Sequence, residues 1–466
     1  MTGVLLRNAE VDGRAGVDLR LRDGRIAEIG PSLDRRGEDE LDCRGGAALP
    51  GLWDAHLHLL ALAAADRSVL CGPPAVDDRA ALAAALGAAA ADPSGWVRGV
   101  GYIETVAGDL DATALDRLHA VRPVRMQHRS GALWMLNSAA IEWLRLAGTD
   151  APGIERDGAG RPTGRLWRSD AELRRLLPQD PPPDLRAVGD RLTRLGITAV
   201  TDATPDLAPE ALAAVTDAMK SGALPQRVQF LGVPLDQPAP GVPGASVGPY
   251  KIVIADSALP GLDDLAARIA GAHAAGRPVA VHCVTRAALV LLLAALDVAG
   301  PLSGDRIEHA ALVPEELVPD LARRGLTVVT QPGFLAHRGE DYLDGVPEDE
   351  HRDLYRCRSL LSAGVPLALS SDAPYGPLDP WAVIEAAVTR RTAAGRVVAG
   401  DERLDPRQAL AAYLADPAAP GTPRRIRTGA VADVVLLDRP SSTVLAGPDA
   451  GAVRAVLIGG RLRSGT

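Results

Sequence analysis

Short apolar runs alternate with longer amphipathic segments through the middle of the chain. Val- and Ile-rich runs of strand length are followed by Ala/Leu/Arg segments of helical period, such as 262–275. This alternation is typical of a parallel sheet covered by helices. We expect eight strands, at 49–58, 197–202, 227–233, 250–255, 278–283, 306–311, 326–331 and 366–372. Eight such units predict an α/β fold, a TIM (β/α)8 barrel.

The two ends of the chain follow a different pattern. Residues 4–29 alternate apolar and polar positions around Asp12-Gly13 and Asp23-Gly24, as short antiparallel strands do. Residues 434–437 and 453–458 are also strand-like, and Gly459-Gly460 favours a hairpin turn. We therefore expect both ends to form one small β-sandwich domain.

The interval between the first two expected barrel strands is too long for one crossover helix. It contains a helix candidate at 79–91, strand-like segments at 96–102 and 124–128, and three prolines at 181–183. These features predict an inserted subdomain after strand 1. The expected organisation is a β-sandwich domain at 1–50 and 425–466, a barrel domain at 51–65 and 186–424, and the inserted subdomain at 66–185.

Candidate chemistry lies at the ends of the expected strands. Asp54-Ala55-His56-Leu57-His58 closes the first strand, and the period of two places both imidazoles on one face. An isolated H-x-H pair is weak support for a metal site. The other strands add to it: His282 lies near the end of the fifth, His309 on the sixth and Asp372 at the end of the eighth. TIM-barrel enzymes keep their active sites at these carboxyl ends.

Lys251 opens the fourth strand candidate. A snorkelling or ion-paired lysine is the ordinary interpretation of such a position. However, the 50 basic residues include only two lysines, Lys220 and Lys251. A lysine within a buried strand of a chain that otherwise uses arginine suggests that an amine is needed, because an amine can be deprotonated and modified.

Composition narrows the class of protein. The chain has 466 residues, of which 47% are hydrophobic, enough for a large core. The formal net charge of −9 argues against a nucleic-acid partner. The four cysteines include no C-x-x-C pair, and no apolar run reaches the length of a membrane span. We expect a cytoplasmic protein with a small-molecule substrate, no nucleic-acid or membrane partner, and a possible homo-oligomeric state.

As a set, these residues resemble the amidohydrolase superfamily, over essentially the whole chain. That family carries H-x-H on strand one, a carboxylated lysine on four, histidines on five and six, and aspartate on eight. The matching positions here are His56, His58, Lys251, His282, His309 and Asp372. The long insertion after the first strand is similar to amidohydrolase family 3, the branch that contains N-substituted formamide deformylases.

The resemblance implies a binuclear metal centre. His56, His58 and Asp372 would hold one divalent ion, His282 and His309 a second, and carboxylated Lys251 would bridge them. Zn²⁺ suits this ligand set best, with Fe, Mn or Co as alternatives. A bridging hydroxide would attack a non-peptide C–N bond of an amide, an N-formyl or N-acyl compound, or a cyclic amide, with Asp372 as the catalytic acid–base group.

Departures from the branch fall outside these ligands. The stretch 131–138 resembles the branch's G-H-x-x-W-V-N-S, but Ala132 replaces the histidine, and Arg168 replaces the acid of T-G-x-L-x-E. The run 283–286 replaces a small-Gly-Asp segment. Substrate contacts are therefore predicted separately from the metal ligands, at Trp134, Asn137, Arg286 and His337.

Two other functions remain open from the sequence. One is a mononuclear deaminase of the same superfamily, against which the lysine argues. The other is a catalytically inactive binding protein, which would be expected to lose ligands that this chain keeps. A lyase or isomerase with the same metal is also compatible, because a fold does not fix a reaction.

Overall fold

The computed structural model describes residues 3–73, 75–90, 92, 94–177, 182–256 and 258–465. The chain divides into two compact units, one of Met1–Leu59 with Asp184–Thr466, and one of Leu60–Pro183. Of the expected proline linker at 181–183, Pro181 lies outside the described residues.

Each of the eight expected central ranges contains a strand of the two parallel sheets in the larger unit, most of them shorter than the expected range, and one further short strand, β15, joins them. Two parallel sheets contain them, with the strand orders β15-β14-β13-β6 and β16-β17-β18-β19-β20. Their bounds are β6 Leu52–Leu57, β13 Ile197–Asp202, β14 Arg227–Phe230, β15 Ala245–Val247, β16 Tyr250–Val253, β17 Val279–Cys283, β18 Arg306–His309, β19 Thr327–Thr330 and β20 Leu367–Leu369.

Backbone hydrogen bonds join the two sheets on both sides. On one side the Lys251 amide of β16 donates to the Leu231 carbonyl, just after β14, at 3.1 Å. On the other side the Asp372 amide, after β20, donates to the His56 carbonyl of β6 at 2.8 Å. The carboxyl ends of β6 and β20 are thereby held side by side.

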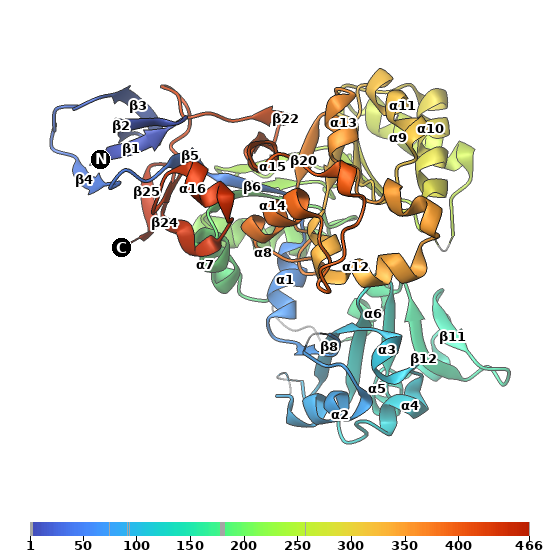
Figure 1. Ribbon diagram of the computed structural model, residues 1–466. Coiled ribbons are helices and arrows are strands. Elements are labelled where there is room, and N and C mark those ends of the chain that lie inside the picture. The colour runs from blue at the N-terminus through green and yellow to red at the C-terminus, as the bar shows by residue number, and fades with distance from the viewer. Residues whose placement is uncertain are drawn as a thin grey trace. The chain divides into compact units, whose positions relative to one another are not determined.

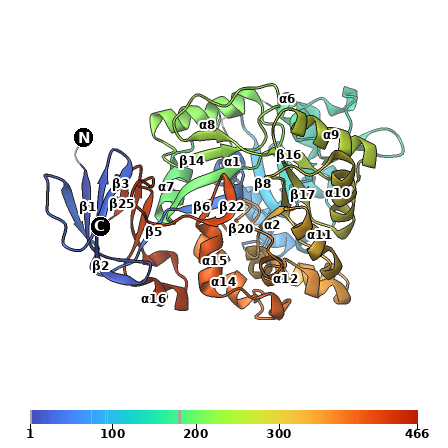
Figure 2. The ribbon, with the colours of Figure 1, turned by 90° about the horizontal axis from the view of Figure 1, so that it is seen from above.

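Helices lie around the outside of these strands, as Figure 2 shows for α8, α9, α10, α11 and α14. The helices of the larger unit are α7 Arg186–Arg194, α8 Pro209–Ser221, α9 Leu262–Ala274, α10 Arg286–Ala299, α11 Val318–Arg323, α12 Gly333–Gly345, α13 Arg358–Ser362, α14 Pro380–Thr389, α15 Pro406–Tyr413 and α16 Ser441–Ala446. A short hairpin, β21 Ala415–Asp416 and β22 Ala419–Pro423, follows α15. In the described ranges, no helix combines the length and the apolar composition needed to cross a membrane.

The first expected strand, 49–58, is wrong as one element. The structure divides it into β5, Ala48–Pro50, which pairs with β23, and β6, which pairs with β13. Gly51 lies at the division, and a Cβ there would come within 2.0 Å of the Thr198 hydroxyl oxygen. The chain changes sheets at a point where only glycine fits against the neighbouring strand.

The expected terminal strands form two four-stranded sheets, and Figure 1 shows both chain ends among them. One sheet contains β1 Val4–Val11, β2 Arg14–Arg22, β3 Arg25–Gly30 and β4 Asp39–Asp42; the other contains β5, β23 Val434–Leu437, β24 Val453–Ile458 and β25 Arg461–Gly465. One apolar cluster includes side chains from both sheets, among them Leu6, Leu19, Val434 and Leu457. The two ends of the sequence therefore share a core.

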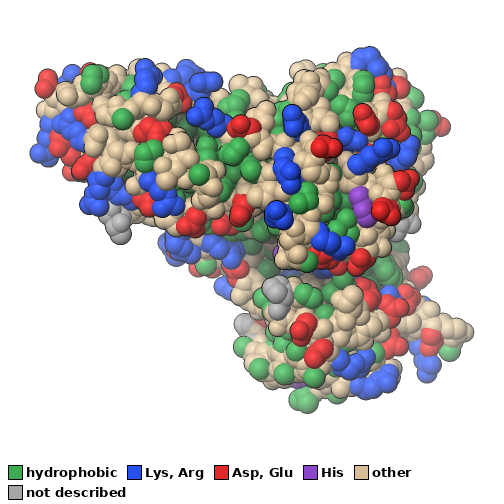
Figure 3. Space-filling model, in the orientation of Figure 1, with side chains coloured by type: hydrophobic (Ala, Val, Ile, Leu, Met, Phe, Trp, Pro, Cys, Tyr) green, Lys and Arg blue, Asp and Glu red, His purple; other side chains and the backbone are tan. Residues whose placement is uncertain are grey.

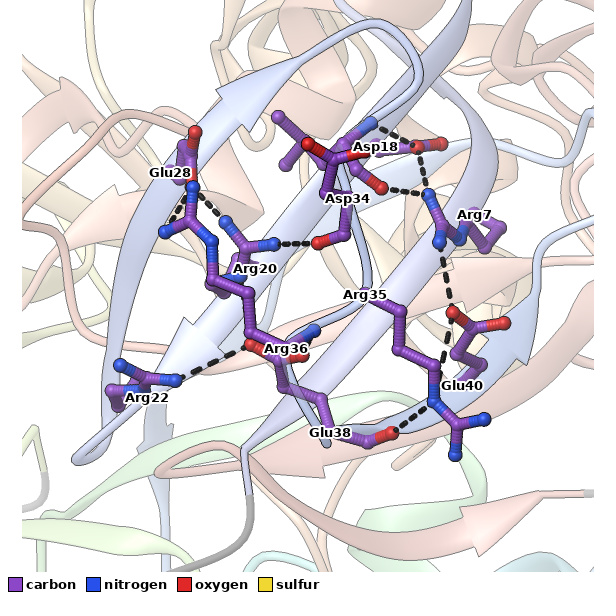
Figure 4. A network of polar contacts seen from close by, with 11 residues as sticks. Arg7, Asp18, Arg20, Arg22, Glu28, Asp34, Arg35, Arg36, Glu38 and Glu40 are labelled. Atoms are coloured by element: carbon purple, nitrogen blue, oxygen red, sulfur yellow. Dashed lines mark hydrogen bonds and ion pairs between the residues drawn. The ribbon is translucent and has the colours of Figure 1, made fainter.

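A network of ion pairs covers the first of these sheets (Figure 4). Arg20 and Glu38 are both buried, and the Arg20 Nε donates to the Glu38 carboxylate at 2.8 Å. Glu38 also accepts from the Arg36 amide at 2.6 Å. Elsewhere on the face shown in Figure 3, basic and acidic side chains are interspersed rather than separated.

The smaller unit contains a six-stranded mixed sheet in the order β11-β12-β10-β9-β8-β7. Its elements are α1 Leu59–Ala65, which begins in the larger unit, β7 Val69–Leu70, α2 Arg79–Ala88, β8 Val97–Tyr102, α3 Glu104–Ala107, α4 Ala112–Asp116, β9 Val124–His128, β10 Leu133–Leu136, α5 Ser138–Trp143, β11 Ile154–Arg156, β12 Pro162–Trp167 and α6 Asp170–Leu176. The expected helix at 79–91 and the strands at 96–102 and 124–128 correspond to α2, β8 and β9. Two apolar clusters form the core of this unit.

Glu38 tests the contribution of the ion-pair network to stability. Burial by itself raises the pKa of this carboxyl group, but hydrogen bonds from backbone amides and from Arg20 outweigh burial and lower the pKa from 4.5 to about 2. A group with a lowered pKa in the folded state stabilises the fold above pH 4.5, and this stabilisation is lost as the pH falls from 4.5 towards 2. Glu38→Gln should therefore lower the free energy of unfolding at neutral pH, measured by urea denaturation.

The difference in unfolding free energy between Glu38→Gln and the unchanged protein should narrow as the pH falls through this window. Glu40→Gln is the matched control, because it removes a carboxylate that pairs with Arg7 and is 36% exposed. Such exposed pairs contribute about 0–1 kcal/mol. A difference for Glu38→Gln that stayed constant from neutral to acid pH would contradict the assignment.

Candidate metal centre

Three side chains converge where β6 and β20 end. The Oδ1 atom of Asp372 lies 3.3 Å from the Nε2 atom of His58 and 3.6 Å from the Nε2 atom of His56. One potential ligand atom from each of the three residues lies within 4.8 Å of the others. The alternating geometry expected at the end of β6 thus brings both imidazoles to the same carboxylate.

Backbone hydrogen bonds hold this arrangement. The His58 amide donates to the Ala373 carbonyl at 2.9 Å, beside the bond from Asp372 to His56. The buried Asp54 carboxylate accepts from the amides of His56, at 3.2 Å, and Ser371, at 3.1 Å, so that it bridges the same two segments. The relative positions of the three candidate ligands are therefore set by the main chain.

Each of three histidines has its Nδ1 atom against an oxygen of a neighbouring strand or loop. The partner of His56 is Glu308, that of His58 is Thr204 at 3.2 Å, and that of His309 is Gln331 at 2.9 Å. The carboxylate of Glu308 and the amide oxygen of Gln331 are acceptors, so they fix the ring and the tautomer of His56 and His309 and leave Nε2 of each ring available for a metal. Glu308 is itself held by the Arg306 Nε at 2.6 Å.

The residues fit a divalent cation. The Oδ1 atom of Asp372 is buried and has no hydrogen-bond donor among the described residues, although two imidazole nitrogens surround it. A buried carboxylate oxygen without a donor carries an uncompensated cost, which a cation would remove. Two imidazole nitrogens and a carboxylate oxygen are also a donor set that Zn²⁺ favours.

His309 and His282 extend the cluster. The His309 ring centroid lies 4.8 Å from that of His56 and 4.4 Å from that of His282. His282 occurs on β17, next to β18, where Cys283 is in register with His309. The four candidate histidines therefore form one continuous group across β6, β17 and β18.

Lys251 is buried on β16. Val253, two residues further along the same strand, is in register with His282. Burial is the main cause that lowers the pKa of Lys251, and the carboxylates of Glu308 and Asp372 oppose the shift. The lysine charge in turn contributes, after burial, to lowering the pKa of His56 well below its ordinary value. Burial therefore favours the neutral form of the amine.

Asn137 and Trp134 belong to the smaller unit. The Asn137 side chain is buried; its oxygen accepts from the Val124 and Ala140 amides, each at 3.0 Å, and its nitrogen donates to two backbone carbonyls. It therefore serves as the N-cap of α5 and as a clamp on β9, which is a structural role. Trp134 is buried in an apolar cluster with Leu136 and other side chains of this unit.

The remaining two expected substrate contacts lie in the larger unit. Arg286 begins α10 with its N-cap at Thr285, is exposed, and pairs with Glu316 at 2.8 Å. His337 lies on α12 and is exposed. Neither residue belongs to the group formed by His56, His58 and Asp372.

Sequence reasoning did not identify the three oxygen partners of the histidines. Glu308, Thr204 and Gln331 lie at or just beyond the ends of strands β18, β13 and β19. A charged residue within an apolar strand, as at Glu308, is a signal in the sequence, because isolated charges are rarely buried. Thr204 and Gln331 give no such signal, since their partners are remote in the sequence.

Known proteins share both the sequence and the fold. The model of the amidohydrolase family matches residues 39–463. The N-substituted formamide deformylase of Arthrobacter pascens is 28% identical, over 89% of this chain and 89% of its own length. The putative amidohydrolase YtcJ of Bacillus subtilis is 27% identical, over 76% of this chain and 75% of its own.

Among solved structures, a metal-dependent hydrolase of Pyrococcus horikoshii superposes with a TM-score of 0.71 at 20% identity and covers 99% of both chains. That likeness shows a shared fold. The match of the family model over most of the sequence goes further, and the chain belongs to the amidohydrolase family.

Proposed function

We propose that the protein is a metal-dependent hydrolase that cleaves a non-peptide C–N bond of a small molecule, in an amide, an N-formyl or N-acyl compound, or a cyclic amide. The observation that carries the proposal is the convergence of His56 and His58 on the Oδ1 atom of Asp372, which is buried and has no hydrogen-bond donor among the residues that the structure describes. The similarity of the sequence to an N-substituted formamide deformylase, at 28% identity, supports the proposal that the bond cleaved is a C–N bond.

In this proposal two divalent ions, with Zn²⁺ preferred, occupy the cluster. His56, His58 and Asp372 would hold one ion, and His282 and His309 the other. Lys251, carboxylated on its amine, would supply one oxygen to each ion. Burial favours the neutral amine that reacts with carbon dioxide, and arginine could not take this role because its guanidinium stays protonated.

The ions would polarise the substrate carbonyl and lower the pKa of water to near neutrality. The protein's own contribution is orientation and proton transfer. Glu308, Thr204 and Gln331 hold the imidazole rings, while Asp372 accepts a proton at its carboxylate and returns it to the leaving nitrogen. The backbone bonds after β20 keep this carboxylate in one place during the transfer.

The proposal includes a finer description of the architecture. Strands β6, β13, β14 and β16–β20 would form a closed (β/α)8 barrel, because hydrogen bonds join the two parallel sheets on both sides. The two terminal sheets, which share an apolar cluster, would form the β-sandwich. The active site then lies at the carboxyl ends of the barrel strands, as in other enzymes of this fold.

Metal content and activity test the proposed function together. Protein purified without chelators should contain close to two divalent ions per chain by elemental analysis. After loading with Zn²⁺ or Mn²⁺, it should hydrolyse members of a library of amides, lactams and N-formyl compounds. One ion per chain together with release of ammonia from an aminopurine or aminotriazine would instead support a mononuclear deaminase. Failure of the protein to bind any divalent ion would overturn the proposal.

Asp372→Asn separates proton transfer from substrate binding. The asparagine keeps an oxygen beside the metal ligands but cannot accept the proton. General acid–base catalysis typically contributes about 10²- to 10⁴-fold to the rate. We therefore expect kcat to fall by at least about 10²-fold while KM changes little. The matched control is Asp349→Asn, at an exposed position. Near-normal kcat in Asp372→Asn would exclude Asp372 as the proton carrier.

Lys251→Ala should lose bound metal and activity, because the bridging oxygens disappear with the amine. Acetate or propionate should restore part of both by supplying a carboxylate, whereas Lys251→Arg should not respond to them. Lys220→Ala is the matched control, since Lys220 is the other lysine of the chain and its side chain is 59% exposed. Growth in ¹³C-labelled bicarbonate should give a carbamate resonance in the unchanged protein and none in Lys251→Ala. Full metal content in Lys251→Ala would contradict the bridging role.

A further inference from the structure

Arg338 lies on the segment that follows β19. Helix α12 begins at Gly333, two residues after Gln331, the partner of His309 (Figure 2). The helical backbone is interrupted at Arg338, where φ is −144° and ψ is 33°. The guanidinium carbon lies 4.1 Å from the centroid of the Phe334 ring and 5.6 Å from that of Tyr342. The side chain is thus held over an aromatic surface in a fixed orientation.

This aromatic surface adjoins the metal centre. Phe334 packs so closely on the turn after Asp372 that a Cβ on Gly376 would come within 2.9 Å of the ring. The Gly376 amide donates to the Asp372 carbonyl at 3.3 Å. Tyr375, in the same turn, packs against the apolar cluster that contains Phe334, and its ring centroid lies 5.6 Å from that of His58. One turn of chain therefore connects the proposed proton carrier to the support of Arg338.

The charge of Arg338 has no acidic partner within ion-pair distance in the part of the chain that the structure describes. Its Nε atom is buried and has no hydrogen-bond acceptor among the described residues. Arg338 as a whole is half-buried. Arg356, which is buried, shows how the fold pairs an arginine: it contacts Asp353 at 2.6 Å and Glu402 at 2.8 Å. Arg338 has aromatic rings in place of such carboxylates.

The electrostatic effects on Arg338 agree with this position. Burial lowers the pKa of the guanidinium, but Tyr342, Tyr355 and the Asp372 carboxylate outweigh it, so that the pKa lies above its ordinary value. The carboxylate of Asp372 is the smallest of these contributions. The guanidinium therefore remains positively charged at neutral pH.

We propose that Arg338 determines specificity by binding a carboxylate of the substrate, so that the preferred substrates are N-formyl or N-acyl amino acids and related acidic amides. This inference rests on the proposed function, because it assigns the substrate class of the same site. A planar guanidinium matches a carboxylate with two parallel hydrogen bonds, and the stacked rings fix the plane in which those bonds point. A neutral amide would leave the half-buried guanidinium without a counter-charge.

Paired substrates test this assignment. N-formyl and N-acetyl derivatives of glycine, alanine, leucine and phenylalanine are each compared with the corresponding primary amide, which has nearly the same shape without the charge. The metal-loaded protein should have a higher kcat/KM for the acid of a pair. Arg338→Gln should lower the ratio of kcat/KM for the acid to kcat/KM for the amide about 10- to 100-fold. The change should come mainly from KM, and the metal content should not change. Arg338→Lys should give an intermediate ratio, because it keeps the charge and loses the fork.

Arg323→Gln is the matched control, because Arg323 is an exposed arginine of α11 that pairs with Asp320. In this variant the acid-to-amide ratio of kcat/KM should equal that of the unchanged protein. Melting temperatures confirm that each variant is folded, and Arg338→Lys provides the comparison if Arg338→Gln does not fold. A ratio that is the same in Arg338→Gln or Arg338→Lys as in the unchanged protein would overturn the assignment.

Calorimetric binding of N-acetylglycine and N-acetylglycinamide to metal-loaded protein separates this inference from the proposed function. If the protein hydrolyses none of the pairs, yet binds the acid at least tenfold more tightly than Arg338→Gln does, the carboxylate site stands and the hydrolase proposal fails for these compounds. If the acid binds equally to both proteins, the carboxylate site is wrong, whatever the hydrolytic activity.

Discussion

The candidate centre depends on the hydrogen-bonded seam between β6 and the residues after β20. Two backbone bonds, from Asp372 to His56 and from His58 to Ala373, join segments that are more than three hundred residues apart in the sequence. Side chains on a strand can converge only if the strand ends are held in register. Asp54 strengthens this connection, because its carboxylate accepts hydrogen bonds from the amides of His56 on one segment and Ser371 on the other. The convergence of His56, His58 and Asp372 therefore results from these main-chain hydrogen bonds.

Electrostatics explains why the cluster needs its supporting residues. Burial lowers the pKa of His56 and His309, which favours the neutral imidazoles that bind metals. A neutral imidazole has one donor nitrogen and one acceptor nitrogen, so an acceptor such as Glu308 or Gln331 at Nδ1 selects which nitrogen faces the centre. Arg306 in turn compensates the charge of Glu308. Orientation and charge balance are thus solved by the same contacts.

The structure separates the proposed chemistry from the proposed choice of substrate. The candidate ligands lie on strands or directly after them, where neighbouring strands restrict their positions. Arg338 lies on α12, a segment that follows a strand end and whose helical course is interrupted. Changes in such connecting segments leave the strands intact, which is how one fold supports many specificities. The departures from the family pattern at Ala132, Arg168 and 283–286 also lie outside the candidate ligands.

The α/β class, the approximate positions of the central strands and the sheets at both ends could be predicted from the sequence by itself. These follow from local periodicity, because a period of two or 3.6 residues is a property of neighbouring positions. The candidate ligands were proposed from residue types at the strand ends and from the resemblance to a known family. Only the tertiary structure decided where 49–58 divides, since Gly51 is required by its contact with Thr198 on another strand. It alone revealed the partners of the histidines, the capping role of Asn137 and the stacking of Arg338 on Phe334. Each of these depends on which remote segments pack together, and periodicity along the chain carries no record of that pairing.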